Sequence, residues 1–452
     1  MKFNSIKTLT VLSSLATLIK ADCQLSSDGN YYCASTDAIV YSNVGISGSY
    51  NDVTSMDESS CACSSQPHQF SGNLAPLDEE LSVHFRGPLN LKQFGVYYPN
   101  QGTSLKKRDG NVVDENCDDT VSKRKHRHKR DVAVEYVEVT ATVYVNEAGE
   151  TITATAAQTK PAADAPTNTP VVGQTTPTTP AAATTQKTNA GKKDSTTSKT
   201  AAVVPSASSS PSDSYSNGDW SRKTYFTPGS ASNCTFMNHQ GGTAGSGTWS
   251  TCFGNSISFA ASNGIDGAPS AFALDDVTLK SGQEYMIFSG TECDGPNGAC
   301  GYYREGIPAY HGFGGSSKIF VFEFEMPTDN NGSGYNQDMP AIWLLNAKIP
   351  RTLQYGNAAC SCWETGCGEM DLFEILSAGS DKLISHVHDG QGGGTQDYFV
   401  RPVGSTLKAA VIFNGDDKSI HIVQVDDDFS GTLSQDTVNS WLNKAGSAAA
   451  LP

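Results

Sequence analysis

The stretch KIFVFEFEMP, from Lys318 to Pro327, carries the clearest structural signal in this chain. Phe320, Phe322, Phe324 and Met326 share one parity, whereas Val321, Glu323 and Glu325 share the other. Successive side chains of a β-strand point to opposite faces, so this spacing predicts a strand with one face against a hydrophobic core.

Similar signals extend over residues 217–452. AAVIFNGDDKSIHIVQVDD, residues 409–427, predicts two strands joined by a turn at Asn414–Asp417. TVNSWLNKA, residues 437–445, is the one short helical pattern that stands out. Many short strands with few helices predict a mainly β domain over 217–452, a concanavalin-like jelly-roll β-sandwich.

Two further regions precede this domain. Residues 22–105 contain cysteines and strand patterns such as LSVHF (81–85), and we expect a small β module there. Residues 131–216 are rich in Thr, Ser, Ala and Pro and are expected to form a disordered, O-glycosylated linker. Within it, residues 134–153 could form an isolated strand or hairpin.

The N-terminus indicates secretion. Residues 1–21 contain an early lysine and an apolar run from Leu9 to Ile19, which predicts a signal peptide; the alternative is a buried core helix. No later apolar stretch approaches the ~20 residues that a membrane span needs. Two sequons, at Asn233 and Asn331, fit a secreted glycoprotein.

Residues 106–130 are strongly basic and contain Lys-Arg pairs followed by Asp. These pairs predict proteolytic processing after Arg108 and Arg130; the alternative is a solvated basic loop or a wall-anchoring patch. The whole chain carries a formal charge of −16, which argues against nucleic acid and anionic membranes as partners.

The chain has 12 cysteines, five before residue 118 and seven after residue 233, as expected of a disulfide-bonded secreted protein. Both numbers are odd, so either a bridge joins the two parts or each part keeps a free thiol. Cys360 and Cys362 would point the same way on a strand, and each is therefore expected to bond a separate partner. A zinc site that includes Cys367 is the alternative.

GCGEMDLFEIL, residues 366–376, threads three carboxylates through large apolar residues. Glu369 and Asp371 share a face of a regular strand, but Glu374 falls on the opposite face, where burial of a charge is costly. One extra residue, a β-bulge at Leu372 or Phe373, would bring Glu374 to the side of the other two acids.

Three acids on one face suit cleavage of a glycosidic bond. The reaction needs one ionised carboxylate to attack the anomeric carbon and one protonated carboxyl group to protonate the leaving oxygen. Crowded negative charges oppose each other's ionisation and so raise the pKa of at least one group. A chance acidic strand is the alternative interpretation of this short pattern.

The order KIFVFEFEMP, DMPAIWLLN and GEMDLFEI resembles glycoside hydrolase family sixteen, whose signature is E-x-D-x-E or its bulged form E-x-D-x-x-E. With its Cys-rich first part, its Thr-rich spacer and the stretches QYGNAACSCWETGCGEMDLFEI and HVHDGQGGG, the whole chain resembles the fungal "target of SBF" cell-wall proteins. The resemblance implies that Glu369 is the nucleophile, Asp371 the assisting acid and Glu374 the general acid/base. Residues 347–367 depart from ordinary family-sixteen enzymes because they are rich in cysteine.

Four aromatic or imidazole side chains are candidates for sugar binding. The resemblance places Trp343 where family members stack a sugar ring, and Trp363 lies close to the acids in sequence; packing in the core is the alternative for both. His386 and His388 would share a face of a strand, with a structural role as the alternative. No third metal ligand accompanies these histidines, so no metal is expected.

The resemblance implies a secreted, monomeric cell-wall glycosidase that needs no cofactor and cleaves β-1,3-glucan with retention of configuration. In one version of the reaction water accepts the glycosyl group, and in the other a second glucan chain accepts it. The other functional class is a catalytically silent protein that binds glucan or supports the wall. The complete set of three acids favours the enzyme, because semi-buried carboxylates are costly to keep.

Overall fold

The structure, a computed structural model, describes residues 23–26, 29–100, 144–145, 151–152, 220–243, 245–296 and 298–451. The predicted signal peptide, processing region and most of the predicted linker lie outside these residues. Within the linker, β8 (Tyr144–Val145) and β9 (Thr151–Ile152) pair antiparallel, which confirms the predicted hairpin. Among the described residues, no helix is long and apolar enough to cross a membrane.

Two ten-stranded sheets make up most of the remaining structure. The first follows the order β11 (Ser230–Ser232), β10 (Trp220–Thr227), β7 (Leu89–Pro99), β19 (Ser317–Glu325), β25 (Leu407–Asn414), β26 (Ser419–Gln424), β3 (Ala38–Ser42) and β28 (Ser447–Ala450). Two short strands, β17 (Thr278–Leu279) and β27 (Thr432–Leu433), join it at β7 and β10.

The second sheet carries the acids. Its order is β16 (Gly267–Ala268), β15 (Ser258–Ala260), β12 (Cys234–Asn238), β18 (Glu284–Ser289), β6 (Leu81–Arg86), β20 (Ala341–Asn346), β21 (Glu369–Glu374), β22 (Lys382–His388) and β23 (Gly393–Gly394). β24 (Phe399–Val400) also pairs with β22. Pairing is antiparallel throughout this sheet.

One hydrophobic core joins the two sheets, and the predicted jelly-roll sandwich is confirmed. Phe320, Phe322 and Phe324 of β19 are fully buried in this core together with Met370 and Leu372 of β21. The predicted hairpin is also present, since β25 and β26 pair from Asn414 and Ser419 onward.

The far side of the first sheet is covered as well. Ile319 and Val321 of β19 are buried there beneath the helix α2 (Gln435–Leu442), which contributes Val438 and Trp441. The helix begins where Ser434 accepts a hydrogen bond from the backbone N–H of Thr437, a usual N-terminal cap. β19 therefore has an apolar residue at Val321 on its second face, where a helix replaces solvent.

Three strands of residues 22–105, namely β3, β6 and β7, lie inside these two sheets. β7 sits between β10 and β19 in the first sheet, and β6 sits between β18 and β20 in the second. The expected cysteine-containing β structure of this region is present, but its main strands do not form a sheet of their own. The first and last parts of the chain together build one sandwich.

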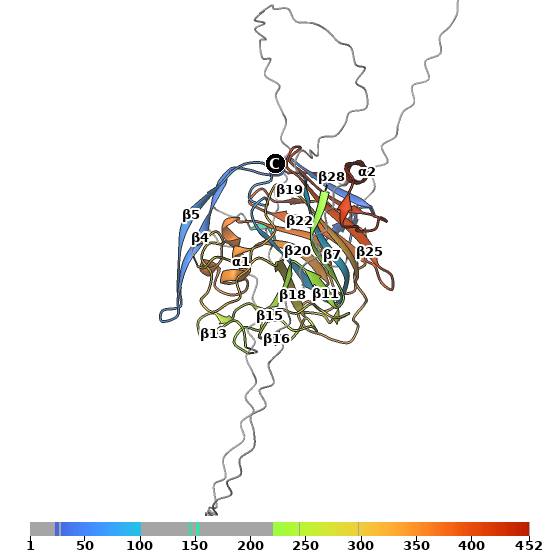
Figure 1. Cartoon of the computed structure of the whole chain (residues 1–452). Helices are drawn as coiled ribbons and strands as arrows, with labels where there is room; N and C mark the ends of the chain where they lie inside the picture. Colours follow the sequence, from blue (N-terminus) through green and yellow to red (C-terminus); the bar gives the residue numbers. More distant parts are fainter. Residues whose placement is uncertain are drawn as a thin grey trace, which may run out of the picture. The chain divides into compact units, whose positions relative to one another are not determined.

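A long hairpin, β4 (Gly48–Asp57) and β5 (Ala62–Phe70), pairs with no strand of either sheet and lies beside the short helix α1 (Lys348–Thr352) (Figure 1). Lys348 of α1 forms an ion pair with Asp52 of β4, with 2.6 Å between Nζ and Oδ2. Two smaller hairpins are β1 (Gln24–Leu25) with β2 (Tyr31–Tyr32) and β13 (Trp249–Ser250) with β14 (Gly254–Asn255).

Disulfides tie the β4–β5 hairpin to the last part of the chain. The bridges are Cys61–Cys252 and Cys63–Cys360, so two bonds join the parts. The cysteine count leaves open either one such bridge or a free thiol in each part. The other bridges are Cys23–Cys33, Cys293–Cys300 and Cys362–Cys367. Cys234 is free, and Cys117 lies outside the described residues.

Cys360 and Cys362 do bond separate partners, as predicted. Neither lies on a strand as the prediction assumed: Cys360 ends the 3-10 helix η1 (Ala358–Cys360) and bonds Cys63, and Cys362 precedes η2 (Trp363–Thr365) and bonds Cys367. All three sulfurs of the alternative zinc site are therefore engaged in disulfides.

The shared sandwich makes the two parts of the chain depend on each other. Residues 217–452 expressed without residues 22–105 would lack β6 and β7, and β18, β20, β10 and β19 would lose a pairing strand. We expect this fragment to show no cooperative thermal transition in circular dichroism, whereas the full chain shows one. A sharp transition in the isolated fragment would contradict the shared fold.

Candidate active site

A β-bulge at Leu372 decides the geometry of the acidic stretch. Ile342 of β20 pairs with Phe373 of β21, but the next residue, Trp343, pairs with Asp371, so Leu372 has no partner on β20. Leu372 and Phe373 both enter the core although they are adjacent in sequence. The predicted bulge is confirmed, and it places Glu374 on the same face as Glu369 and Asp371.

Side chains from both sheets support this bulge from the core. A bulge interrupts the backbone ladder and leaves polar groups that need other partners. The hydroxyl of Ser385 on β22 donates to the backbone carbonyl of Asp371 at 2.6 Å. Tyr41 of β3 donates in turn to the Ser385 hydroxyl at 3.0 Å. A residue from the first part of the chain thus helps to hold the acidic strand.

The acids lie on the face of the second sheet that is turned away from the core, here called the outer face. Strand pairing arranges this face in three rows that cross β6, β20, β21 and β22. The rows are Arg86, Ala341, Glu374 and Ile384; His84, Trp343, Asp371 and His386; and Ser82, Leu345, Glu369 and His388. Each of the three acids therefore occupies a different row, with Asp371 between the two glutamates.

Glu369 is half-buried, and burial is the main reason that its pKa rises to about 8. The neighbouring Asp371 carboxylate raises it further. The indole N–H of Trp363 opposes this effect by donating to Glu369 Oε2 at 2.5 Å, and His388 favours the ionised form as well. The group thus holds a proton under conditions in which an exposed glutamate would have lost it.

Glu374 is also half-buried, and its pKa rises to about 7, again mainly through burial and then through Asp371. Arg86 limits this rise in pKa, because its Nη2 lies 3.2 Å from Glu374 Oε1. Ala341 lies between them on β20, and its small side chain lets Arg86 reach across that strand. The Nε of Arg86 donates to the carbonyl of Met339 at 2.8 Å, which fixes the orientation of the guanidinium.

The two histidines differ in their relation to Asp371. His388 Nε2 lies 3.2 Å from Asp371 Oδ2, and this hydrogen bond raises the pKa of His388. The pKa of His386 is lowered, mainly by burial. A Cβ on Gly394 would lie 2.3 Å from His386 Cδ2, so the glycine-rich stretch after His388 leaves the space that His386 fills.

The two tryptophans also differ. Trp343 lies on the outer face beside the acids but is only 5% exposed, packed with Tyr50 of β4 and with its ring 5.1 Å from that of His84. This burial favours a packing role and leaves little of its ring for a sugar. Trp363 is 47% exposed and touches Glu369, so it is the better placed of the two for substrate contact.

Sequence reasoning did not single out Arg86, Ser385 or Tyr41. The signal for Arg86 was present, because LSVHFR alternates Leu81, Val83 and Phe85 with polar residues and so marks a strand with one polar face. Assigning that strand to a separate module hid its place beside β20. No local sequence pattern predicts that Ser385 and Tyr41 form hydrogen bonds at the bulge.

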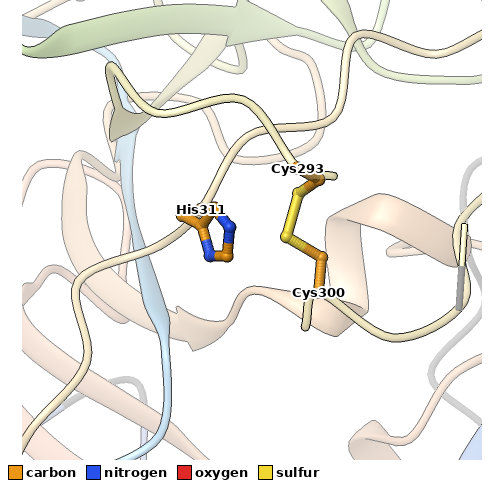
Figure 2. A group of neighbouring side chains, drawn as sticks. All are labelled: Cys293, Cys300 and His311. Atoms are coloured by element: carbon orange, nitrogen blue, oxygen red, sulfur yellow. A yellow bond between two sulfur atoms is a disulfide. The ribbon is translucent and has the colours of Figure 1, made fainter. Parts of the chain in front are cut away.

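Among the described residues, another group of potential metal ligands consists of Cys293, Cys300 and His311 (Figure 2). The two sulfurs form a disulfide, and they are therefore not thiolates that could bind a metal. His311 Nδ1 lies 2.5 Å from Glu80, whose other oxygen contacts the buried Arg351 at 2.6 Å. The group reads as a structural cluster.

Comparison with known proteins connects this geometry to a family. The family described as "Cell wall protein YJL171C/Tos1, C-terminal" matches residues 218–441, and its N-terminal counterpart matches residues 37–99. The chain belongs to the Tos1 family of cell wall proteins. No solved structure matches it significantly.

Several relatives in this family cover nearly the whole chain. A Saccharomyces cerevisiae protein named "Probable circularly permuted 1,3-beta-glucanase TOS1" is 63% identical over 98% of this chain and 97% of its own length. A Candida albicans protein of the same name is 50% identical over the full length of both chains. An Arthroderma benhamiae protein named "Probable circularly permuted 1,3-beta-glucanase" is 34% identical over 94% of each.

The raised pKa of Glu369 has a consequence for stability in this Tos1-family protein. A carboxyl group whose pKa is higher in the folded state than in the unfolded chain costs folding free energy once both states are ionised. This cost is absent below the unfolded value, about 4.5, and grows until the pH passes about 8.

Glu369→Gln is therefore expected to stabilise the protein at pH 8, by an amount on the order of a few kcal/mol, and to have little effect at pH 4. Urea unfolding of both proteins at the two pH values measures this difference. Glu305→Gln, at an exposed residue, is the matched control and should show no such pH dependence. A gain at pH 4 that equals the gain at pH 8 would contradict the assigned environment.

Proposed function

We propose that this protein is a secreted cell-wall glycosidase that cleaves β-1,3-glucan and retains the anomeric configuration. The single observation that carries the proposal is the bulge at Leu372, which gathers Glu369, Asp371 and Glu374 on one face and leaves apolar residues behind them. The names of the family relatives, which describe probable 1,3-beta-glucanases, support the choice of substrate.

The proposed chemistry uses the two glutamates in turn. Glu369 attacks the anomeric carbon of the bound sugar while Glu374 gives its proton to the leaving glycosidic oxygen, so the C–O bond breaks and a glycosyl-enzyme ester forms. Glu374 then removes a proton from the incoming water or sugar hydroxyl, which displaces Glu369. This double displacement needs the two carboxyl groups about 5 to 5.5 Å apart, the separation we expect here.

Asp371 has a supporting role in this proposal. It lies in the row between the two glutamates, and its Oδ2 contacts Nε2 of His388. Its negative charge raises the pKa of both glutamates, which keeps a proton in the site for Glu374 to donate. The His388 contact balances that charge and fixes the carboxylate between its neighbours.

Incubation with laminarin-type oligosaccharides tests the proposed activity, and product lengths separate its two versions. Hydrolysis gives only shorter chains, whereas transfer to a sugar hydroxyl also gives chains longer than the substrate. A wild-type protein that binds these oligosaccharides without cleaving them would replace the proposal with the catalytically silent, glucan-binding function. NMR that showed an inverted product would contradict the roles of the glutamates.

Substitution of the acids should separate their roles. Glu369→Gln should abolish turnover and leave glucan binding intact, because an amide cannot form the ester. Glu374→Gln should slow cleavage of glucan roughly 10²- to 10⁴-fold and slow cleavage of an activated aryl glucoside far less, since a good leaving group needs little acid assistance. Asp371→Asn should leave weak activity with a shifted pH profile. Wild-type rates in all three variants would refute the site.

Azide distinguishes the nucleophile from the acid/base directly. With an activated β-glucoside, azide added to Glu369→Ala should replace the missing nucleophile and give the α-glucosyl azide. Azide added to Glu374→Ala should instead attack the glycosyl-enzyme and give the β-glucosyl azide. If the two variants exchange products, the roles of Glu369 and Glu374 are reversed.

A further inference from the structure

An exposed tyrosine, Tyr355, extends the polar outer face beyond the acids. It follows α1 in the cysteine-rich segment and is 51% exposed. Its hydroxyl donates to Glu284 Oε2 of β18 at 2.8 Å. Glu284 lies opposite Arg86 on the neighbouring strand β6, and Arg86 forms an ion pair with Glu374. Polar side chains therefore continue from Tyr355 to the acids.

The segment that carries Tyr355 is held on both sides. Gln354 Oε1 lies 3.0 Å from the ring nitrogen Nε2 of His239, and the His239 ring meets the edge of Tyr355 with 5.7 Å between ring centres. Leu353 is buried against Phe253 and Cys360. Cys360 is in turn bonded to Cys63 of the β4–β5 hairpin. The tyrosine is therefore an exposed ring on a fixed support, which needs little ordering when a ligand binds.

An exposed aromatic ring beside a carboxylate suits a sugar. The ring offers an apolar surface to the C–H face of a pyranose, and a carboxylate accepts hydrogen bonds from its hydroxyl groups. Resting on the proposed glucanase function, we propose that Tyr355 and Glu284 form a glucan-binding subsite separate from the position of bond cleavage. Tyr355 stacks on one glucose ring of the chain, and Glu284 binds its hydroxyl groups.

The position of this subsite predicts a dependence on chain length. Glu284 lies on β18, which is three strands away from β21 in the order β18, β6, β20, β21. Neighbouring strands are about 4.8 Å apart, so β18 and β21 are separated by about 14 Å. A glucan chain must therefore cross the strands to occupy both positions, and we expect only chains long enough to do so to contact the acids and the Tyr355 ring together.

Binding of short and long laminari-oligosaccharides tests the subsite. The measurement uses calorimetry on the full chain with Glu369→Gln, in which the substrate stays intact. Adding Tyr355→Ala should weaken binding of long oligosaccharides about two- to tenfold and leave the short ones unchanged. Tyr355→Phe should keep most of the affinity, because the ring remains. Phe272→Ala is the matched control, since Phe272 is an exposed aromatic (47%) on the connection between β16 and β17.

Kinetics of the otherwise wild-type protein provide a second readout. Tyr355→Ala should raise KM for long substrates and leave kcat for short ones unchanged, because the residue does not touch the reacting atoms. If Tyr355→Ala binds and cleaves all lengths as the wild type does, the subsite is refuted and the proposed function stands. If the wild type neither binds nor cleaves any of these glucans, the proposed function fails and the subsite fails with it.

Discussion

The one-residue bulge at Leu372 is the constraint on which the site depends. Without it, Glu374 would point into the core between Met370 and the phenylalanines of β19, where an unpaired carboxylate is far too costly to bury. With it, two adjacent apolar residues enter the core and three acids face outward. The bulge thus fills the core with apolar side chains and also brings the acids together, and burial and the charge of Asp371 raise the pKa of both glutamates.

The bulge is itself held by a fold that the two ends of the chain build together. Tyr41, on β3, supports Ser385 from the first sheet, and Arg86, on β6, limits the pKa of Glu374 from the second. Both residues come from the first part of the chain, far from the acids in sequence. The inner strands of the sandwich therefore come from distant parts of the chain. The disulfides of the β4–β5 hairpin add covalent ties to the same arrangement.

Local pattern was sufficient for much of this structure. The alternation in β19, the turn after Asn414 and the bulge at Leu372 could all be predicted because each is a property of a few neighbouring residues. Partners across strands could not, since strand order depends on the whole chain. Arg86 and Glu284 therefore escaped notice, and Trp343, which the resemblance placed against a sugar, is only 5% exposed. The site could be predicted as a set of acids but not as a surface.

The raised pKa values of the two glutamates in the free protein affect how the proposed reaction can begin. Burial raises the pKa of Glu374 and Arg86 limits the rise, so that the pKa is about 7. This is near the value at which an acid both holds and gives a proton at neutral pH. The pKa of Glu369 is raised as well, to about 8, mainly by burial. A nucleophilic Glu369 must be ionised when it attacks the bound sugar. The indole N–H of Trp363 and the charge of His388 both favour the ionised form of Glu369, and Asp371 holds His388 in place. In the proposed reaction, a sugar that packs against the exposed ring of Trp363 would also exclude water from the hydrogen bond between Trp363 and Glu369, and so would link the arrival of substrate to the charge of the proposed nucleophile.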